Sequence, residues 1–233
     1  MSSVKYVEDH GGRVLDNSKI QIIFWGKKWE TSSSKKIFRN QIKFALCKIF
    51  VSDYFIKLNQ YRDIHKPSLL KIVTNTVSKA PDSFSDRHMQ HAIVDLILNK
   101  TVAYDHDTAF ILIPTEDMKL DCEDPEIVDG GHDFFSYKLR YDQQETIVTI
   151  PFGYIINFND IDQITLTITH EIVEIVTNPE YDGIYGHLGM CKYAEDQQCE
   201  LADICETSSD SVTISNTLVS KYWSNIDQKC VPS

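Results

Sequence analysis

The chain has 233 residues, of which 42% are hydrophobic and 24% are charged, so its length and composition fit one globular domain with a substantial core. The formal charge of −11 argues against nucleic acid as a partner, because no excess of basic residues is present to neutralise phosphates, and it disfavours an anionic membrane surface. No apolar run reaches the ~18 residues that a membrane-spanning helix needs.

Up to residue 158 the hydrophobic pattern predicts strands and helices in alternation, after a polar N-terminal arm over 1–18. Strands are indicated where apolar and β-branched residues alternate or form short runs between turn residues. Helices are indicated where apolar residues recur every three or four positions after a Ser or Asp that can cap the first turn. The predicted strands are 20–25, 69–77, 110–114, 134–141 and 146–156, and the predicted helices are 32–61 and 85–100.

Three features of this part allow simple expectations. The strongly apolar strand 110–114 is expected in the centre of a sheet, and the acidic stretch 115–131 is expected to form a solvated surface loop. His88 and His91 lie three positions apart on the second predicted helix and could bind a metal ion. Exposed helix histidines are the commoner explanation for such a pair.

The next predicted helix carries the motif with the clearest chemistry. His170 and Glu174 are four positions apart, so a helix places them on one face, with Glu171 about 100° further round the turn. In the metalloprotease helix H-E-x-x-H two histidines bind zinc and the Glu is the general base. Here Glu174 stands in the place of the second histidine. A charged stripe on an amphipathic helix would be the simpler explanation of this motif on its own.

The helix prediction depends on this chemistry more than on residue propensity. Residues 164–169 are rich in β-branched side chains and alternate as a strand would. The spacing of the three polar side chains makes chemical sense only on a helix, and burial in a core would outweigh the propensity cost. Asp160 or Asp162 can cap this helix, and Asn178-Pro179 ends it.

A second acidic pair follows a Gly- and Tyr-containing loop over 179–199. Glu200 and Asp203 are three positions apart, and a short helix would place both on one face. A catalytic zinc site needs a third protein ligand and an open position for water, and Glu200 could be that ligand. Asp203 could hold the free ring nitrogen of His170. The alternative is that acidic residues favour the first turn of any helix. Both motifs together favour a metal site within residues 160–206.

Cysteine positions bear on the compartment. Four of the six cysteines lie in the last quarter, which predicts disulfides that staple the C-terminal part and an oxidising environment. Our interpretation pairs Cys191 with Cys199 and Cys205 with Cys230, and the final 25 residues are expected to form a hairpin. Free buried thiols in a cytosolic protein are the alternative, and the lack of a C-x-x-C pair disfavours a cysteine zinc site. Met1 precedes polar residues and no apolar signal segment, so a secreted location needs a removed signal or another export route.

Four segments, in chain order, resemble one protein family. Its motifs H-G-G-x-V-L…I-F-W-G, H-E-x-x-E-x-x-T-[ND]-P, E-[IL]-[AG]-D-x-C and W-S-N…C-V are similar to residues 10–15 with 22–26, 170–179, 200–205 and 222–231. The family is a group of bacterial secreted proteins related to the plant phosphate-induced EXORDIUM proteins. The resemblance implies a zincin-type metallopeptidase and an extracellular location. The pair Glu200 and Asp203 also resembles the third-ligand helix of thermolysin-like peptidases, which implies that Glu200 binds zinc and Asp203 supports His170.

The sequence therefore predicts a single α+β (mixed α/β) zincin-like domain over 1–233, with a twisted sheet packed on helices, an active-site helix and a disulfide-stapled C-terminal part. One zinc ion per chain is expected on His170, Glu174 and Glu200, with water in the fourth position. Glu171 is the predicted general base for hydrolysis of a protein or peptide substrate. The oligomeric state is not indicated.

Several points stay open at this stage. Two carboxylate ligands with a neutral histidine cancel the zinc charge, which weakens the metal as a Lewis acid and makes Mg, Ca or Mn acceptable as well. An extended peptide could dock on an edge offered by strand 146–158. The alternatives are a non-catalytic metal-containing extracellular binding or signalling module, and a domain without metal. Candidates for donating to a substrate oxyanion are Tyr185, His187, Tyr193 and His132.

Overall fold

The computed structural model describes residues 6–75, 81–121, 129–141, 144–156, 158, 160–191, 198–206 and 211–232. Its helices are α1 (Lys28–Thr31), α2 (Ser33–Val51), α3 (Asp86–Leu98) and α4 (Ile161–Thr177), with 3₁₀ helices η1 (Tyr54–Gln60), η2 (Leu188–Met190) and η3 (Asp203–Cys205). The strands of the first half are β1 (Glu8–Asp9), β2 (Lys19–Trp25), β3 (Ser68–Asn75), β4 (Ser83–Phe84), β5 (Thr108–Pro114) and β6 (Lys119–Leu120). The later strands are β7 (Gly130–Tyr141), β8 (Gln144–Ile155), β9 (Ile184–His187), β10 (Gln198–Cys199), β11 (Ser211–Ile214), β12 (Thr217–Ser220), β13 (Tyr222–Ser224) and β14 (Lys229–Val231).

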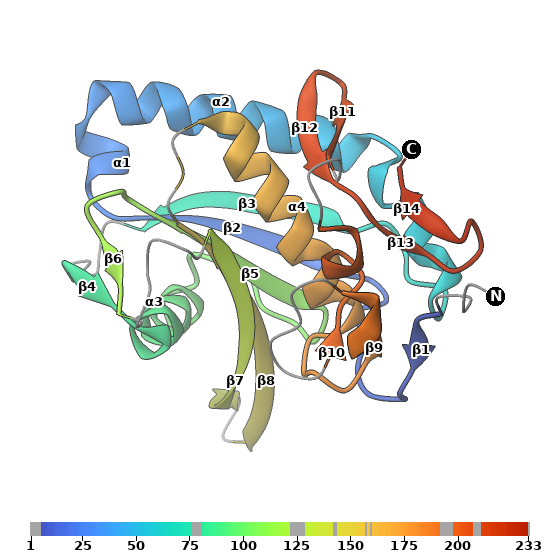
Figure 1. Cartoon of the computed structure of the whole chain (residues 1–233). Helices are drawn as coiled ribbons and strands as arrows, with labels where there is room; N and C mark the ends of the chain where they lie inside the picture. The colour runs from blue at the N-terminus through green and yellow to red at the C-terminus, as the bar shows by residue number, and fades with distance from the viewer. Residues whose placement is uncertain are drawn as a thin grey trace.

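A five-stranded sheet with the order β3-β2-β5-β8-β7 forms the middle layer (Figure 1). The first four strands run parallel, and β7 pairs antiparallel with β8 at the edge. Every residue of β5 is buried, so the prediction of a central strand at 110–114 is confirmed. The β7–β8 pair extends beyond the sheet, because β8 pairs with β5 only over Phe152–Tyr154 but with β7 along its whole length.

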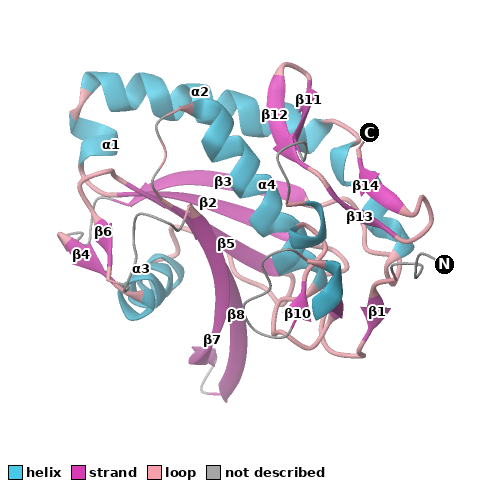
Figure 2. Cartoon of the chain, viewed as in Figure 1, coloured by secondary structure: helices cyan, strands magenta, loops and turns pink. Residues whose placement is uncertain are grey.

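Helices cover both faces of this sheet (Figure 2). Ile22 and Phe24 of β2 enter the core beneath α2, η1 and α4, whereas Ile23 and Trp25 enter the core beneath α3. A parallel sheet buried on both faces explains why its strands are nearly continuous apolar runs in the sequence. The mixed α/β class is thereby confirmed. None of the helices in the described ranges has the length and apolar character needed to cross a bilayer.

The helix predicted over 32–61 ends earlier than expected. Ser32 accepts a hydrogen bond from the Lys35 N–H at the start of α2, but the helix stops at Val51. At Ser52 the backbone turns to an extended conformation, and its hydroxyl donates to the Ile49 carbonyl. The chain then forms η1, where Tyr54, Phe55 and Leu58 are buried at a spacing of three or four positions. That continued spacing made two helices look like one in the sequence.

The helix predicted around the acidic motif is confirmed as α4, which lies across the sheet between α2 and the β11–β12 hairpin (Figure 1). The Asp160 carboxylate caps its start by accepting the Gln163 N–H. Its threonines place their hydroxyls on carbonyls of the preceding turn, as Thr165 and Thr169 do. The β-branched residues of α4 are thus compatible with a helix, because their hydroxyls are satisfied and their methyl groups are buried in the core.

Two disulfides staple the C-terminal part, with the predicted pairing of Cys191 with Cys199 and Cys205 with Cys230. The first connects the end of η2 to β10, and the second connects η3 to β14. Cys47 is an exposed free thiol, and Cys122 lies outside the described residues. The predicted single C-terminal hairpin is wrong, because two hairpins are present, β11–β12 and β13–β14.

Two further predictions need correction. The docking edge predicted at 146–158 is wrong for 152–154, where β8 pairs with both β5 and β7, and the outer strands of the sheet are β3 and β7. The loop predicted over 115–131 contains the short strand β6, and its last two residues, Gly130 and Gly131, already belong to β7. The parallel pairing of β5 with β8 leaves β7 on the outside of the sheet, whereas β6 pairs separately with β4.

A hydrogen bond between α4 and β12 provides a test of how the C-terminal part is held. The buried Ser220 N–H donates to Thr169 Oγ1 at 2.9 Å. Thr169→Val keeps the side-chain shape but leaves this N–H without an acceptor, so we expect the free energy of unfolding to fall by about 1–3 kcal/mol. Denaturant unfolding should show a lower midpoint with an unchanged slope.

Thr167→Val is the matched control, because the Thr167 hydroxyl also donates to a carbonyl of its own helix, that of Gln163. Within the described ranges no hydrogen bond joins this hydroxyl to another element. An equal loss of stability in both variants would contradict the assigned role of the bond to Ser220.

Candidate metal centre

The second half of α4 buries two carboxylates in an otherwise apolar environment. Glu171 and Glu174 are each about 95% or more buried, among neighbours such as Ile172, Val173 and Ile175 that are fully buried. A buried carboxylate is costly unless cations or hydrogen-bond donors surround it. The groups that approach these two side chains from other elements therefore define the site.

His170, Glu174 and Asp203 form the first group of potential ligands. The Nε2 atom of His170 lies 3.0 Å from Glu174 Oε1 and 3.2 Å from Asp203 Oδ1. The helical turn at η3 brings Asp203 to this place, since the Ile204 N–H donates to the Glu200 carbonyl just before it. The predicted short helix is thus reduced to one turn, and the Cys205–Cys230 disulfide fixes its end.

His132 of β7 forms the second group, with Glu174 and Glu200. Its Nδ1 atom lies 3.3 Å from Glu171 Oε2, in a hydrogen bond, and 3.5 Å from Glu174 Oε2. Its Nε2 atom lies 3.5 Å from Glu200 Oε1. Only 6% of the His132 side chain is exposed. This histidine is therefore surrounded by three carboxylates, at a place where the sequence predicted only a candidate oxyanion donor.

Two buried polar atoms in this cluster have no hydrogen-bond partner, Nε2 of His132 and Oε1 of Glu174. Each faces another group of the cluster at a distance of 3.0 to 3.5 Å, but without the geometry of a hydrogen bond. Buried polar groups in native proteins are almost always satisfied. A metal ion is a partner that suits both atoms, so the residues present fit a metal site.

Glycine at position 130 allows β7 to approach α4 this closely. A Cβ atom at Gly130 would lie 2.5 Å from Thr167 Cγ2 and 3.1 Å from Glu171 Oε1. Any side chain there would therefore push the strand away from the helix. The strand would carry His132 with it, away from the carboxylates.

Residues just after α4 hold the other side of the cluster. The Asn178 amide donates to Glu200 Oε1 at 2.7 Å, and its oxygen accepts the Gly183 N–H at 2.8 Å. The Tyr181 hydroxyl donates to the His132 carbonyl at 2.6 Å, and its ring lies against the His132 ring. The sequence predicts Asn178 only as the end of the helix and indicates no role for Tyr181. No local pattern marks either as a contact of the site.

The charges of the cluster shift the pKa values of its members. Burial is the largest influence on both histidines and lowers their pKa, but the neighbouring carboxylates outweigh it, so that the pKa of His132 and that of His170 are well above 6.5. Burial raises the pKa of Glu174 well above its ordinary value, although His170 acts against it. For Asp203 burial raises the pKa, but the contact with His170 outweighs it and leaves the pKa below 3.8. In the metal-free protein, protons bound by His132, His170 and Glu174 therefore stabilise the cluster.

The structure separates the predicted site residues into two sets. It brings together His170, Glu171, Glu174, Glu200, Asp203 and His132. Tyr185 instead stacks on His10 at 3.8 Å, and His187 lies 3.2 Å from Glu8 Oε1, so both contact the N-terminal arm. Tyr193 lies outside the described residues. His88 bonds with Ser85 in the capping box of α3.

The three predicted ligands do not form one group in the structure. His170 and Glu174 belong to one group, and Glu174 and Glu200 belong to the other. Asp203 contacts the same nitrogen of His170 as Glu174 does, whereas Glu200 faces His132. The roles assigned to Glu200 and Asp203 from the sequence stay predictions.

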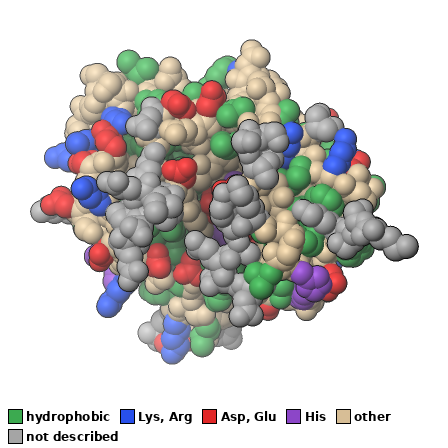
Figure 3. All heavy atoms as spheres, viewed as in Figure 1, with side chains coloured by type: hydrophobic (Ala, Val, Ile, Leu, Met, Phe, Trp, Pro, Cys, Tyr) green, Lys and Arg blue, Asp and Glu red, His purple; other side chains and the backbone are tan. Residues whose placement is uncertain are grey.

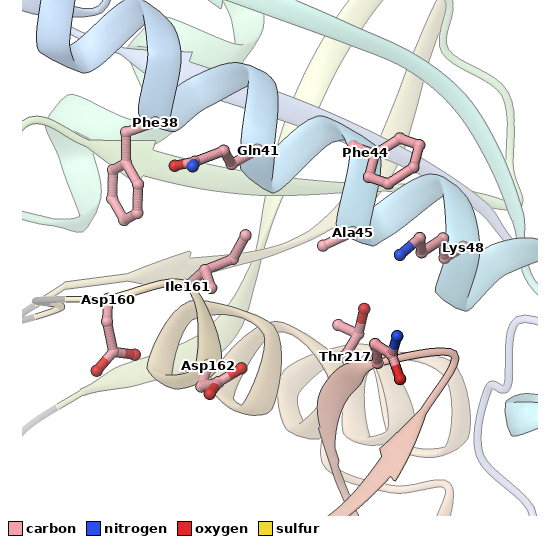
Figure 4. A pocket seen from close by; sticks show the side chains of 10 residues that line it. Phe38, Gln41, Phe44, Ala45, Lys48, Asp160, Ile161, Asp162 and Thr217 are labelled. Atoms are coloured by element: carbon pink, nitrogen blue, oxygen red, sulfur yellow. The ribbon is translucent and has the colours of Figure 1, made fainter.

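The cluster opens to the surface of the molecule. His170 and Asp203 keep 19% and 25% of their side chains exposed, so small molecules can reach this side. Figure 3 shows acidic and histidine side-chain atoms within a recess near the centre of one face. A separate cavity of about 440 Å³ lies between α2, the start of α4 and the β11–β12 turn (Figure 4). Its lining includes Phe38, Phe44 and Ile161 but no residue of the cluster.

Comparison with known proteins gives no match to a family model, a curated protein or a solved structure.

The pKa directions predict how the stability of the metal-free protein depends on pH. The folded state holds protons on His132 and His170 more tightly than the unfolded state, so this contribution is complete below about pH 6.5 and is lost as the pH rises through the raised values. The raised pKa of Glu174 acts in the same direction. In the presence of a chelator, Tm should therefore fall between about pH 6.5 and the raised pKa values. Each tenfold difference in proton affinity between the folded and unfolded states contributes about 1.4 kcal/mol to this loss.

His132→Gln should flatten this pH dependence, because it removes one of the three groups whose protons the folded state holds more tightly. His91→Gln on α3, an exposed histidine outside the cluster, is the control and should keep the wild-type slope. If the Tm of the wild-type chain in chelator rises steadily with pH over the same range, the cluster is not stabilised by bound protons and the prediction is wrong.

Proposed function

We propose that the chain is a zinc-dependent peptidase of the zincin type that acts outside the cell. The observation that carries the proposal is the buried Glu174, whose Oε1 atom has no hydrogen bond although it lies 3.0 Å from His170 Nε2 on a helix with the H-E-x-x-E motif. Zinc is the proposed metal because imidazole suits it well. The two disulfides support an oxidising compartment.

The proposed zinc ligands are His170, Glu174 and Asp203. This set differs from the sequence prediction in its third member, because Asp203 and Glu174 face the same nitrogen of His170. The 25% exposure of Asp203 leaves an approach for water and substrate, as a catalytic site needs. When bound, the metal would supply an acidified water and a polarised carbonyl.

Glu171 is the proposed general base. It follows the ligand His170 directly on α4, and its carboxylate points into the cluster, where the His132 Nδ1–H holds it at 3.3 Å. In peptide hydrolysis Glu171 would take the proton of the attacking water and pass it to the leaving amine, so that the carboxylate returns to its starting state. Its 7% exposure keeps solvent from competing for that proton.

The free edge of β7 supports a peptide as substrate. In the described part of the sheet no strand pairs with the outer side of β7, and this strand begins at the cluster with Gly130, Gly131 and His132. An extended peptide can add to such an edge through main-chain hydrogen bonds. A peptide bond would then lie beside Glu171.

A non-catalytic metal-binding module is the second candidate. It is favoured by the ligand set itself, because Glu174 and Asp203 together cancel the charge of one divalent ion and weaken it as a Lewis acid. Such a module would serve recognition or stability outside the cell. A third candidate, a domain without metal, would show no change of Tm on chelation.

Glu171→Gln separates a peptidase from a binding module. The substitution keeps the size and the hydrogen bond to His132 but removes the base, so we expect peptide hydrolysis to fall by about 10²–10⁴-fold. Zinc content and Tm should stay at the wild-type level. Cleavage of a fluorogenic peptide library by the zinc-loaded chain is the measurement.

Asp162→Asn is the matched control, an exposed carboxylate on the first turn of the same helix, and it should leave cleavage unchanged. Equal cleavage by the wild-type and Glu171→Gln chains would refute the role of Glu171. A wild-type chain that binds zinc and cleaves no peptide of the library would favour the binding module.

A further inference from the structure

We propose that the centre holds two divalent cations that share Glu174. One lies at His170, Glu174 and Asp203, and the second lies at His132, Glu174 and Glu200. This inference rests on the proposed metal function and adds a second ion with its own ligands.

The two oxygens of Glu174 face different histidines. Oε1 lies 3.0 Å from His170 Nε2, and Oε2 lies 3.5 Å from His132 Nδ1. The ligand atoms of His170, Glu174 and Asp203 all lie within 4.8 Å of one another, and so do those of His132, Glu174 and Glu200. This connectivity is that of a carboxylate that bridges two metal ions, as in two-metal hydrolytic sites with ions about 3.5–4 Å apart.

The hydrogen bond of His132 leaves one ring nitrogen for a metal. Metal binding requires a neutral ring, and because Nδ1 is bonded to Glu171 Oε2, this nitrogen then keeps its proton and Nε2 offers a lone pair. Nε2 is buried without a hydrogen-bond partner and lies 3.5 Å from Glu200 Oε1. A cation bound by both atoms would take the place of the proton that Nε2 holds in the metal-free protein. Glu171 then orients the histidine from outside, as carboxylates commonly do for metal-binding histidines.

The charge of the cluster also fits two ions better than one. Four carboxylates meet here, those of Glu171, Glu174, Glu200 and Asp203, together with two histidines that are neutral when they bind metal. One divalent ion would leave a net charge of about −2 in a largely buried site, whereas two ions would make it neutral. Uncompensated buried charge is strongly unfavourable.

Metal content tests this proposal directly. The full disulfide-bonded chain, stripped with a chelator and reloaded with zinc, should contain about two ions per chain by mass spectrometry after gel filtration. His132→Ala and His132→Gln should each keep about one, and His170→Ala should also lose one. His91→Ala, a helix histidine outside the cluster, is the control for adventitious zinc and should keep about two.

EPR of the Mn²⁺-loaded wild-type chain tests whether two ions share one carboxylate, and its main result needs no variant. Two Mn²⁺ ions bridged by one carboxylate are magnetically coupled, so the EPR signal of isolated Mn²⁺ should be largely lost at full loading. The His132→Gln chain should regain the signal of an isolated ion. Its circular dichroism in chelator should match the wild type, which shows that the change is not unfolding.

The outcomes separate this proposal from the proposed function. About one zinc per chain, lost in His170→Ala but kept in both His132 variants, would overturn the second ion and leave the zinc peptidase standing. Two ions that persist in the His132 variants, or an uncoupled Mn²⁺ spectrum at full loading, would also overturn it. No bound metal in the wild-type chain would overturn both proposals.

Discussion

The burial of Glu174 in the middle of α4 is the constraint on which the rest of the centre depends. A carboxylate in an apolar helix face requires compensating charge, and two histidines of the chain face it. His170 comes from the preceding turn and His132 from the edge strand β7. Asp203 and Glu200, from the segment that the Cys205–Cys230 disulfide fixes, contact these histidines and add further negative charge. These elements are far apart in sequence, so the position of one charged side chain links the sheet, the helix and the C-terminal part into one unit. The contact of Asn178 with Glu200 has the same effect at the end of α4.

The parts of this centre that follow from local spacing could be predicted from the sequence. The relation of His170, Glu171 and Glu174 follows from helix geometry alone, which is why it was predictable even though residues 164–169 look like a strand. The disulfide pairing was also predicted, although cysteine spacing does not determine it. His132 was not recognised as a central residue because its place depends on the register of β7 against β8 and on Gly130 allowing contact with α4. No window of sequence around His132 contains that information.

The sheet shows the same limit on a larger scale. Apolar runs located its strands well, but they do not specify which strand lies at the edge, because β7 and β8 are both long and form one hairpin. The parallel pairing of β5 with β8 decides this, and it joins segments that are far apart in the sequence. The misjudged end of α2 has a different origin, since α and 3₁₀ helices present similar apolar spacing and only the backbone at Ser52 separates them. Periodicity thus located these buried segments without specifying how each one ends or pairs.

A ligand set rich in carboxylates weakens a bound metal as a Lewis acid, and the geometry of Glu174 bears on how strong this effect is. With one ion, the full charges of Glu174 and Asp203 fall on the same metal, which then has little Lewis acidity left for a carbonyl. With two ions, the charge of Glu174 is divided between them, and Glu171 stays outside as a hydrogen-bond partner of His132. Each ion then carries a net positive charge, although the site as a whole is neutral. An excess of carboxylates, which argues against catalysis at a single metal, is in this arrangement what allows two cations to lie close together in a buried site.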